Sequence, residues 1–412
     1  MNIRPIAISL SPNSQTDDVG ECFKAFLNFT TWQKGIWEEK VQNWFIKYYQ
    51  VKNIYLFNSG RSALFAILKS YGIGFDDEVI VQAFTCVAVP DPVIWVGAKP
   101  VYVDIDESLN IDCGLLSRYI TNKTKAIIVQ NTFGIPAKLN EIKKITQKYN
   151  LVLIEDCSHS LGATLEGKRI GDFGDAAFFS FGRDKIISSV FGGAAFIRKS
   201  DADNKLKRIY EELSYPKLSW ILKQLFHPLA FFIILPLYNF YLGKVILFLM
   251  QKINILSKPV ENIELTGGIP AVYPQKLPNA LARLAFNQLQ KLESFNIRRK
   301  EIAQLYFEKL QGLKSIRLPP QNKEAIYLRF NILSSKRDEI FKIFRRHKIL
   351  LGLWYSNIID PVGVDYNKVG YKLGMAKNAE EKAHLSLNLP TYPTIAENQV
   401  MYLINLIIKY AD

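Results

Sequence analysis

The chain has 412 residues, of which 49% are hydrophobic and 22% are charged. This balance excludes a disordered chain and supplies enough apolar side chains for two or three domains. The formal net charge of +14 suits nucleic acid, an anionic membrane surface or a phosphorylated substrate, and equally a generally basic proteome.

The four cysteines and four histidines are scattered along the chain. No cysteine pair and no histidine pair has the spacing of a metal site, so we expect neither a metal centre nor a disulfide framework. The N-terminal segment lacks the long apolar core of a signal peptide. These features predict a reduced, cytoplasmic protein. Nucleic-acid binding is not expected, because the basic residues form no groove motif with interleaved aromatic residues.

Short apolar segments alternate with helical patterns between about residues 52 and 199. The segments are rich in β-branched residues, as in strands that are buried on both faces of a parallel sheet. The alternation predicts a three-layer α/β domain with a mostly parallel sheet. We expect strands at 54–57, 78–82, 100–104, 126–130, 151–154 and 176–181, and helices at 62–71 and 139–149.

Residues 213–260 interrupt this pattern, because they contain five lysines and no Asp or Glu. The uncharged stretch between Lys223 and Lys244 approaches the length of a membrane span, although two prolines lie within it. A single span would place residues 253–412 on the opposite side of the membrane from the α/β domain, so we expect both flanks on one side. The segment is either a membrane-contacting hairpin, favoured by its lysines and aromatic residues, or a helical insertion covered by protein.

Residues 279–311 predict one long amphipathic helix, because their leucines recur near helical spacing. The chain beyond it mixes strand and helix patterns and predicts a smaller α+β domain. We therefore predict four parts. They are an N-terminal segment (1–50) that packs on the small domain, a large α/β domain (51–212), the basic apolar insertion (213–265), and the long helix with the small domain (266–412).

Polar residues follow three of the expected strands. The strand at 151–154 is followed by Glu155-Asp156, the strand at 176–181 is followed by Lys185, and the strand at 54–57 ends in Asn58-Ser59-Gly60 at a helix start. Open α/β sheets bind ligands at the carboxyl ends of their strands. An amine, a carboxylate and an anion site at such ends make a cradle for pyridoxal phosphate (PLP).

Each requirement of PLP has a candidate residue. Lys185 would supply the amine that bonds the cofactor, and Asp156 would keep the pyridine nitrogen protonated. The helix start around Ser59 would hold the phosphate through backbone amides, and Ser180 would add a hydroxyl. For packing against the ring, the sequence leaves three candidates open: Phe84, Cys86 and His159.

Longer motifs surround these residues and resemble those of one family. They include NSGRSALFAIL, QNTFGIPAKLNEI, LIEDCSHSLGATLEGKRIGDFGDAAFFSFGRDK and LSLNLPTYPTIAENQV. The chain resembles the DegT/DnrJ/StrS family of PLP-dependent sugar aminotransferases over about residues 25–199 and 277–406. This resemblance implies PLP-transferase fold type I and a homodimer with active sites at the subunit interface. It also implies a keto-sugar substrate, usually linked to a nucleotide, and an amino-acid donor, with L-glutamate expected.

The resemblance also implies a role for each matched residue. Lys185 becomes the catalytic lysine and Asp156 the partner of the pyridine nitrogen, with His159 near the ring. Phosphate contacts fall to four residues, namely Ser59, Gly60, Arg61 and Ser180.

Three departures from the family pattern stand out. Cys86 replaces an aromatic residue, so Phe84 is left as the candidate for ring stacking. The asparagine that the partner subunit lends to the phosphate is replaced near Pro274. The 213–260 insertion is longer than in soluble members, which suggests a lipid-linked sugar or a membrane-bound pathway.

Two alternatives use the same residues. A PLP-dependent sugar dehydratase of this fold carries histidine in place of the lysine, so Lys185 argues against it. A non-catalytic, membrane-associated relative is the other, and the altered ring and phosphate positions allow it.

Overall fold

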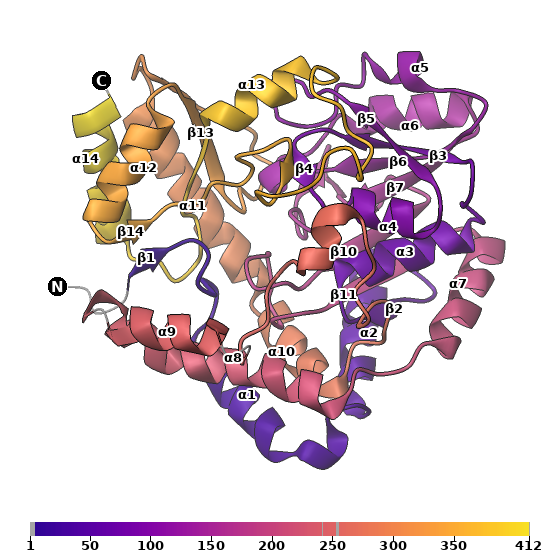
Figure 1. The fold of residues 1–412 in the computed structure, drawn as a ribbon, viewed down its shortest axis with the longest axis horizontal. Coiled ribbons are helices and arrows are strands. Elements are labelled where there is room, and N and C mark those ends of the chain that lie inside the picture. Colours follow the sequence, from indigo (N-terminus) through magenta and orange to yellow (C-terminus); the bar gives the residue numbers. More distant parts are fainter. Residues whose placement is uncertain (1–4, 241, 253–254, 412) are drawn as a thin grey trace.

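The computed structural model describes residues 5–240, 242–252 and 255–411 (Figure 1). Its centre is a seven-stranded sheet with the order β2-β11-β10-β7-β6-β3-β5. Every strand in it runs parallel to the others except β11, which is antiparallel to both neighbours. The strands are β2 (Tyr55–Phe57), β3 (Glu78–Gln82), β5 (Lys99–Val103), β6 (Thr124–Gln130), β7 (Val152–Asp156), β10 (Ala176–Ser180) and β11 (Gly193–Ile197). The predicted mostly parallel α/β sheet is confirmed.

Successive strand residues supply two separate cores, one on each face of the sheet. Ala177 and Phe179 pack into the core covered by α2 (Ile36–Tyr49), α6 (Leu139–Lys148) and α10 (Asn279–Leu289). Ala176 and Phe178 point to the other core, which contains α3 (Gly60–Ser70), α4 (Pro90–Trp95) and part of α7 (Ser200–Glu212). Burial on both faces explains why the strand sequences are almost continuously apolar.

The small domain is built on an antiparallel sheet of β12 (Ile316–Arg317), β13 (Phe330–Ser334) and β16 (Ser386–Leu389). Its core is closed by α11 (Leu292–Leu310), α12 (Arg337–Arg346) and α14 (Glu397–Ala411). The remaining short elements are α5 (Leu116–Tyr119), α13 (Lys377–Leu385), β8 (Thr164–Leu165), β9 (Lys168–Arg169), and the 3₁₀ turns at Phe29–Thr31, Thr132–Gly134 and Asn262–Thr266.

The N-terminal segment contacts both domains. β1 (Ile6–Ala7) pairs with β14 (Ile349–Leu350) of the small domain. In contrast, α1 (Thr16–Leu27) and α2 lie against α10, and their apolar residues belong to the large-domain core. The four-part division of the chain stays a prediction.

The long helix expected at 279–311 forms as two helices, α10 and α11. The backbone of Lys291 leaves the helical region, with φ −101° and ψ 0°. The Lys291 ammonium is held by Asp17 at 2.8 Å and Asp18 at 2.9 Å, both on α1. The break keeps α10 in the large-domain core and lets α11 continue into the small-domain core. Spacing of leucines alone does not reveal it.

Residues 218–240 and 242–252 form a helical hairpin that lies across one side of the molecule (Figure 1). α8 (Leu218–Leu237) passes through a 3₁₀ turn (Tyr238–Phe240) and α9 (Leu242–Lys252) returns alongside it. A Cβ on Gly243 would lie 2.4 Å from the carbonyl oxygen of Ile234, so the two helices meet closely there. Within the described part of the chain, α8 is the one helix long and apolar enough to cross a membrane.

Candidate active site

A cavity of about 510 Å³ lies at the carboxyl ends of the parallel strands. Its walls come from the parallel strands and from a C-terminal segment, because β4 (Thr85–Cys86) pairs in parallel with β15 (Ile359–Asp360). Eight of the nine predicted site residues line it: Ser59, Gly60, Arg61, Cys86, Asp156, His159, Ser180 and Lys185. Lys185 and Asp156 thus face one shared space.

Phe84 is the ninth predicted residue, and it does not line the cavity. Its side chain is fully buried. Its ring meets Phe133 edge-on at 6.2 Å and Tyr355 edge-on at 5.3 Å between centroids. Tyr355 does line the cavity, so Phe84 supports the wall from behind. The expectation that Phe84 packs on a ligand ring does not agree with this position.

Lys185 faces His159, with 2.8 Å between Nζ and Nε2. The other ring nitrogen, Nδ1, accepts a hydrogen bond from the backbone N–H of Phe133 at 3.4 Å. Burial, together with the neighbouring side chains of Lys185 and Arg329, holds the pKa of His159 well below its ordinary value. Because a neutral imidazole with an accepting Nδ1 carries its proton on Nε2, we assign the proton to Nε2, from where it is donated to Lys185.

This assignment makes the Lys185 amine an acceptor, and therefore neutral. Burial lowers the pKa of Lys185, and the nearby carboxylate of Asp156 only partly opposes the change. A neutral amine has the free electron pair that a nucleophile needs. The geometry and the charge balance thus favour the same reactive form.

Asp156 ends β7, between Gln130 on β6 and Phe178 on β10. Its Oδ1 accepts the backbone N–H of Ser158 at 2.9 Å. Burial raises the pKa of Asp156 against the opposing effects of hydrogen bonds from Ser158 and of nearby Lys185. A buried carboxylate that lines the cavity fits a positively charged ring nitrogen.

The neighbouring Glu155 has a different environment. It is fully buried, and its carboxylate accepts the backbone N–H groups of Gly171, Phe173 and Gly174 at 2.5–2.7 Å. These bonds fix the loop before β10. Of the adjacent acidic pair, only Asp156 faces the cavity.

An anion seat lies where β2 leads into α3. Ser59 caps the helix by accepting the N–H of Ser62 at 3.1 Å, and the first-turn amides have no acceptor inside the helix. A Cβ on Gly60 would lie 3.1 Å from the Cβ of Ser180, so the turn and the Ser180 hydroxyl are close neighbours. Backbone amides and hydroxyls of this kind suit a phosphate group.

The Arg61 side chain turns away from this seat toward Glu264. The two form a buried ion pair, and the guanidinium also donates to the Pro259 carbonyl at 2.8 Å and to the Tyr273 hydroxyl at 3.1 Å. Burial opposes the charge of Arg61, but Tyr273 and Glu264 outweigh it and raise its pKa. The Arg61 charge is therefore already neutralised, and its backbone amide is the part free to meet an anion.

Cys86 lies at the end of β4 and lines the cavity. Burial raises its pKa to about 11, so the thiol stays protonated at neutral pH. A protonated thiol behaves as a small apolar group and is a poor nucleophile, so Cys86 contributes an apolar surface to the cavity wall. No bulky ring is present at this position.

Two aromatic residues of the wall, Trp354 and Tyr355, escaped the sequence analysis. Both rings lie nearly parallel to His159, at 6.3 Å between centroids. The Arg329 guanidinium covers the Trp354 ring at 3.5 Å and lies 4.0 Å from Asp184. Burial raises the pKa of Asp184 to about 6 and lowers that of Arg329 to about 10. Only folding brings this distant segment to the cavity, so no local pattern marks it.

The insertion also reaches the cavity, because Lys258, Pro259 and Val260 line it. Next to them, Arg183 donates to the Ser257 hydroxyl at 2.5 Å. No signal in the sequence pointed to these residues as part of the site.

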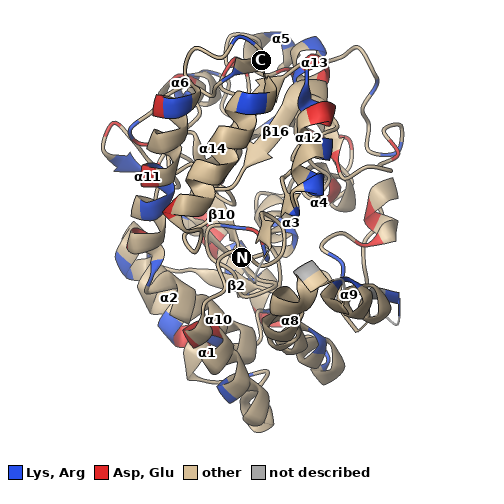
Figure 2. Cartoon of the chain, turned by 90° about the vertical axis from the view of Figure 1, so that its left-hand side faces the viewer, with Lys and Arg blue, Asp and Glu red and all other residues tan. Residues whose placement is uncertain are grey.

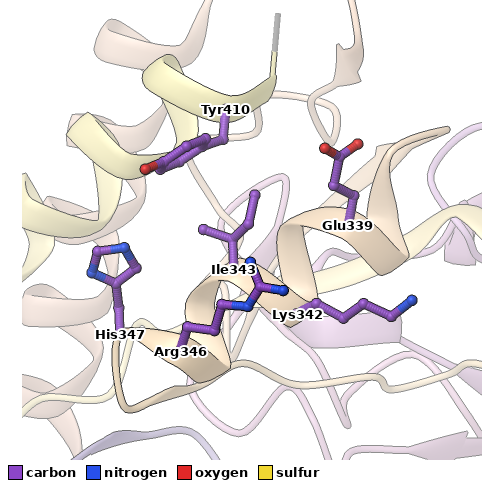
Figure 3. Close-up of a pocket in the computed structure, with 6 residues that line it drawn as sticks. All are labelled: Glu339, Lys342, Ile343, Arg346, His347 and Tyr410. Atoms are coloured by element: carbon purple, nitrogen blue, oxygen red, sulfur yellow. The ribbon is translucent and has the colours of Figure 1, made fainter.

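A second hollow of about 450 Å³ lies on the small domain between α12 and α14 (Figure 3). Figure 3 shows side chains from two helix surfaces around it, including Lys342, His347 and Tyr410. The residues that line this hollow come from the two helices and their ends, and not from the carboxyl ends of strands. Among the described residues, no three His, Cys, Asp or Glu side chains are arranged to hold a metal ion.

Comparison with known proteins gives one matching family model. The DegT/DnrJ/EryC1/StrS aminotransferase family model matches residues 14–218 and 257–408. The gap between the two matches, residues 219–256, coincides with the α8–α9 hairpin.

Curated relatives match over most of the chain. An uncharacterized protein of Methanocaldococcus jannaschii is 30% identical over 382 residues, covering 90% of this chain and 89% of the relative. The GDP-perosamine synthase of Escherichia coli O157:H7 is 25% identical to this chain. The match covers 93% of this chain and 92% of the synthase. Among solved structures, the Helicobacter pylori aminotransferase PseC superposes with a TM-score of 0.75 at 21% identity, covering 98% of this chain and 99% of PseC.

Proposed function

The chain belongs to the DegT/DnrJ/EryC1/StrS aminotransferase family, and from this premise we propose how it acts. It is a PLP-dependent sugar aminotransferase of glycan or polysaccharide biosynthesis. The finer proposal is that L-glutamate supplies the amino group and that a keto sugar, linked to a nucleotide or to a lipid, receives it. The observation that carries this proposal is the shared cavity of Lys185, Asp156 and the α3 N-terminus.

Within that cavity we assign one task to each group. When bound, PLP supplies an electron sink that stabilises negative charge on the substrate carbon. The Asp156 carboxylate would hold the positive ring nitrogen, and the amides of Gly60 and Arg61 with the Ser180 hydroxyl would hold the phosphate. The protonated thiol of Cys86 and the ring of His159 are the remaining groups that border the ring position.

Lys185 would also move the proton. Its neutral Nζ can take a proton from the substrate carbon and return it one position away, as a general base and then a general acid. The His159 Nε2–H donates to Nζ and orients the lone pair. The buried walls of Trp354 and Tyr355 would exclude water during this transfer.

We propose a homodimer with shared active sites. The support is the segment after the insertion, which borders the cavity at residues 258–260 and then exposes two isoleucines, Ile263 and Ile269. Apolar residues exposed next to a site suit a subunit contact.

We propose a cytoplasmic location that extends to the inner face of the cell membrane. All four cysteines are free thiols, as suits a reducing compartment. The membrane part of the proposal is supported by the apolar, lysine-bearing segment 213–260.

The test uses the purified enzyme and Lys185→Ala. The wild type should carry a visible absorbance band that glutamate bleaches, and it should pass labelled nitrogen from glutamate to a keto sugar. Lys185→Ala should lose both the band and the transfer, whereas Lys309→Ala, on the exposed face of α11, should keep both. A fully active Lys185→Ala enzyme would refute the assignment. Screening nucleotide-linked and lipid-linked keto sugars then identifies the acceptor, with glutamine as a second donor.

A further inference from the structure

The α8–α9 hairpin is apolar on two faces, and the described protein covers only one. The inner face of α8 is buried: Ile221 and Leu225 join the large-domain core, while Ala230, Phe231 and Ile234 form a cluster with Leu256. The outer face of the hairpin exposes large apolar side chains, with Phe240 68% exposed, Phe248 63% and Ile233 60%. Phe232, Leu242 and Leu249 are exposed on the same two helices. An exposed apolar surface of this size needs a partner.

The charges around this face have one sign. Residues 213–260 contain Lys217, Lys223, Lys244, Lys252 and Lys258 but no acidic residue. All of these lysines except the half-buried Lys223 are exposed. Figure 2 shows the two helices as mainly uncharged ribbon with basic positions at intervals. The partner must therefore be apolar and negatively charged.

The hairpin does not cross a bilayer as a span, because both of its ends are fixed to the enzyme body. At its start, Trp220 of α8 lies edge-on to Phe191 in the cavity wall, at 5.6 Å between ring centroids. At its end, Ser257 donates to Gln224 of α8 at 2.6 Å. The helices can therefore only lie along a membrane, with the outer face toward the lipid.

A second copy of the chain fits this face less well. In a twofold symmetric contact the same patch meets itself, so lysines would face lysines with no acidic side chain of this segment between them. Anionic lipid headgroups supply the opposite charge, at about 1 kcal/mol for each lysine near the surface. The family model also matches on either side of residues 219–256 and not across them, so the hairpin is an addition to the enzyme domain.

We propose that the outer face of α8 and α9 docks the enzyme on the anionic cytoplasmic leaflet of a membrane. The two helices lie in the plane of the interface, with Phe240, Phe248 and Leu249 at the acyl boundary and the lysines among the headgroups. This inference deepens the location given under the proposed function and rests on it only for the choice of leaflet.

Docking in this manner fixes how the active site faces the membrane. Arg183, two residues before Lys185, donates to Ser257, and Ser257 in turn donates to Gln224 of α8. Residues 258–260, directly after the hairpin, form part of the cavity wall. The hairpin is thus joined directly to the loop that carries Lys185 and to the cavity wall.

Vesicle flotation of the purified full-length holoenzyme tests the docking. Wild type should float with vesicles of phosphatidylcholine and phosphatidylglycerol, and much less with phosphatidylcholine alone. Phe240→Ser with Phe248→Ser and Leu249→Ser should lower the partition coefficient at least about tenfold. Lys217→Glu with Lys252→Glu should lower it at least about 25-fold, because each lost lysine contributes about fivefold.

A matched control carries the same kinds of change on another surface. Phe75 is 93% exposed and Lys309 lies on α11, so Phe75→Ser with Lys309→Glu should float like the wild type. Circular dichroism and the visible absorbance band report whether each variant is folded and loaded, independently of flotation. The proposal is overturned if the wild type and the hairpin variants float equally well. It is also overturned if neither floats. Light scattering that shows the serine variant as a smaller oligomer, without wild-type flotation, assigns the face to a second copy and also overturns it.

Discussion

Asp156 is buried at the end of β7 and faces the cavity. Burial raises its pKa, which means that its negative charge costs free energy in the protein without ligand. Under the proposed function, the positive ring nitrogen of PLP offsets this cost. The same residue should therefore affect the empty and the loaded enzyme in opposite directions.

Asp156→Asn separates these two effects. The amide keeps an oxygen for the Ser158 N–H, so the PLP-free variant should unfold at the same temperature as the PLP-free wild type or higher. Its affinity for PLP should fall by about 150-fold to 5,000-fold, because removing one partner of a buried ion pair costs about 3–5 kcal/mol. Calorimetric melting and PLP titration measure the two quantities. A less stable variant with unchanged PLP affinity would make Asp156 a purely structural residue.

His159 should make stability depend on pH in a defined direction. Burial holds its pKa well below the ordinary value of 6.5, so between these two pKa values only the unfolded chain binds the proton. Stability is therefore full above about pH 6.5 and decreases as the pH falls below it, by up to about 1.4 kcal/mol per pH unit. His159→Gln should remove this part of the decrease.

Urea unfolding of the PLP-free protein at about pH 5 and about pH 7 measures the difference. The loss of stability between the two values should be smaller in His159→Gln than in the wild type. His384→Gln, on the exposed end of α13, is the control and should follow the wild type. Identical pH dependence in His159→Gln and the wild type would contradict a neutral, buried imidazole.

At the scale of elements, the start of α3 depends on the lack of a side chain at Gly60. A Cβ there would lie 3.1 Å from the Ser180 Cβ and 3.5 Å from the Phe179 carbonyl oxygen. Gly60→Ala should push Ser180 away from the proposed phosphate seat, lowering stability by about 1–3 kcal/mol and weakening PLP binding. Gly20→Ala is the matched control, because its Cβ meets nothing within 4 Å and it lies inside α1. It should stabilise the fold by about 0.5–1 kcal/mol.

Thermal melting and PLP titration of both variants test this contrast. Unchanged PLP affinity in Gly60→Ala would place the phosphate elsewhere.

Elements and site residues differed in how far the sequence could predict them. The large-domain strands and their polar ends were predictable, because buried parallel strands carry a dense apolar signal and ligand groups follow them directly. The break between α10 and α11 was not, since it depends on the ion pairs of Lys291 with α1. Trp354 was missed for a similar reason, because the pairing of β15 with β4 carries its segment to the cavity. Phe84 was misjudged because spacing gives no side-chain direction at a residue with φ +61°.

At the scale of the whole molecule, the cavity joins segments that lie far apart in the sequence and pack in one core. The large domain supplies Asp156 and Lys185, and the C-terminal part supplies Trp354, Tyr355 and Asp360. Tyr355, Ile359 and Tyr371 belong to the large-domain core, so this segment is already held there, and a bound ligand should add to that stability. A ligand at 100 times its Kd stabilises the state that binds it by about 2.7 kcal/mol.

Hydrogen exchange detected by mass spectrometry tests this added stability. Adding PLP to the PLP-free enzyme should slow amide exchange at β4 and β15 and in the segment 354–361, as well as at the start of α3. Exchange on α12, which lies in the small-domain core and away from the cavity, should change least. Protection confined to the large domain would mean that the wall of Trp354 and Tyr355 does not respond to the cofactor, and that these residues serve the substrate alone.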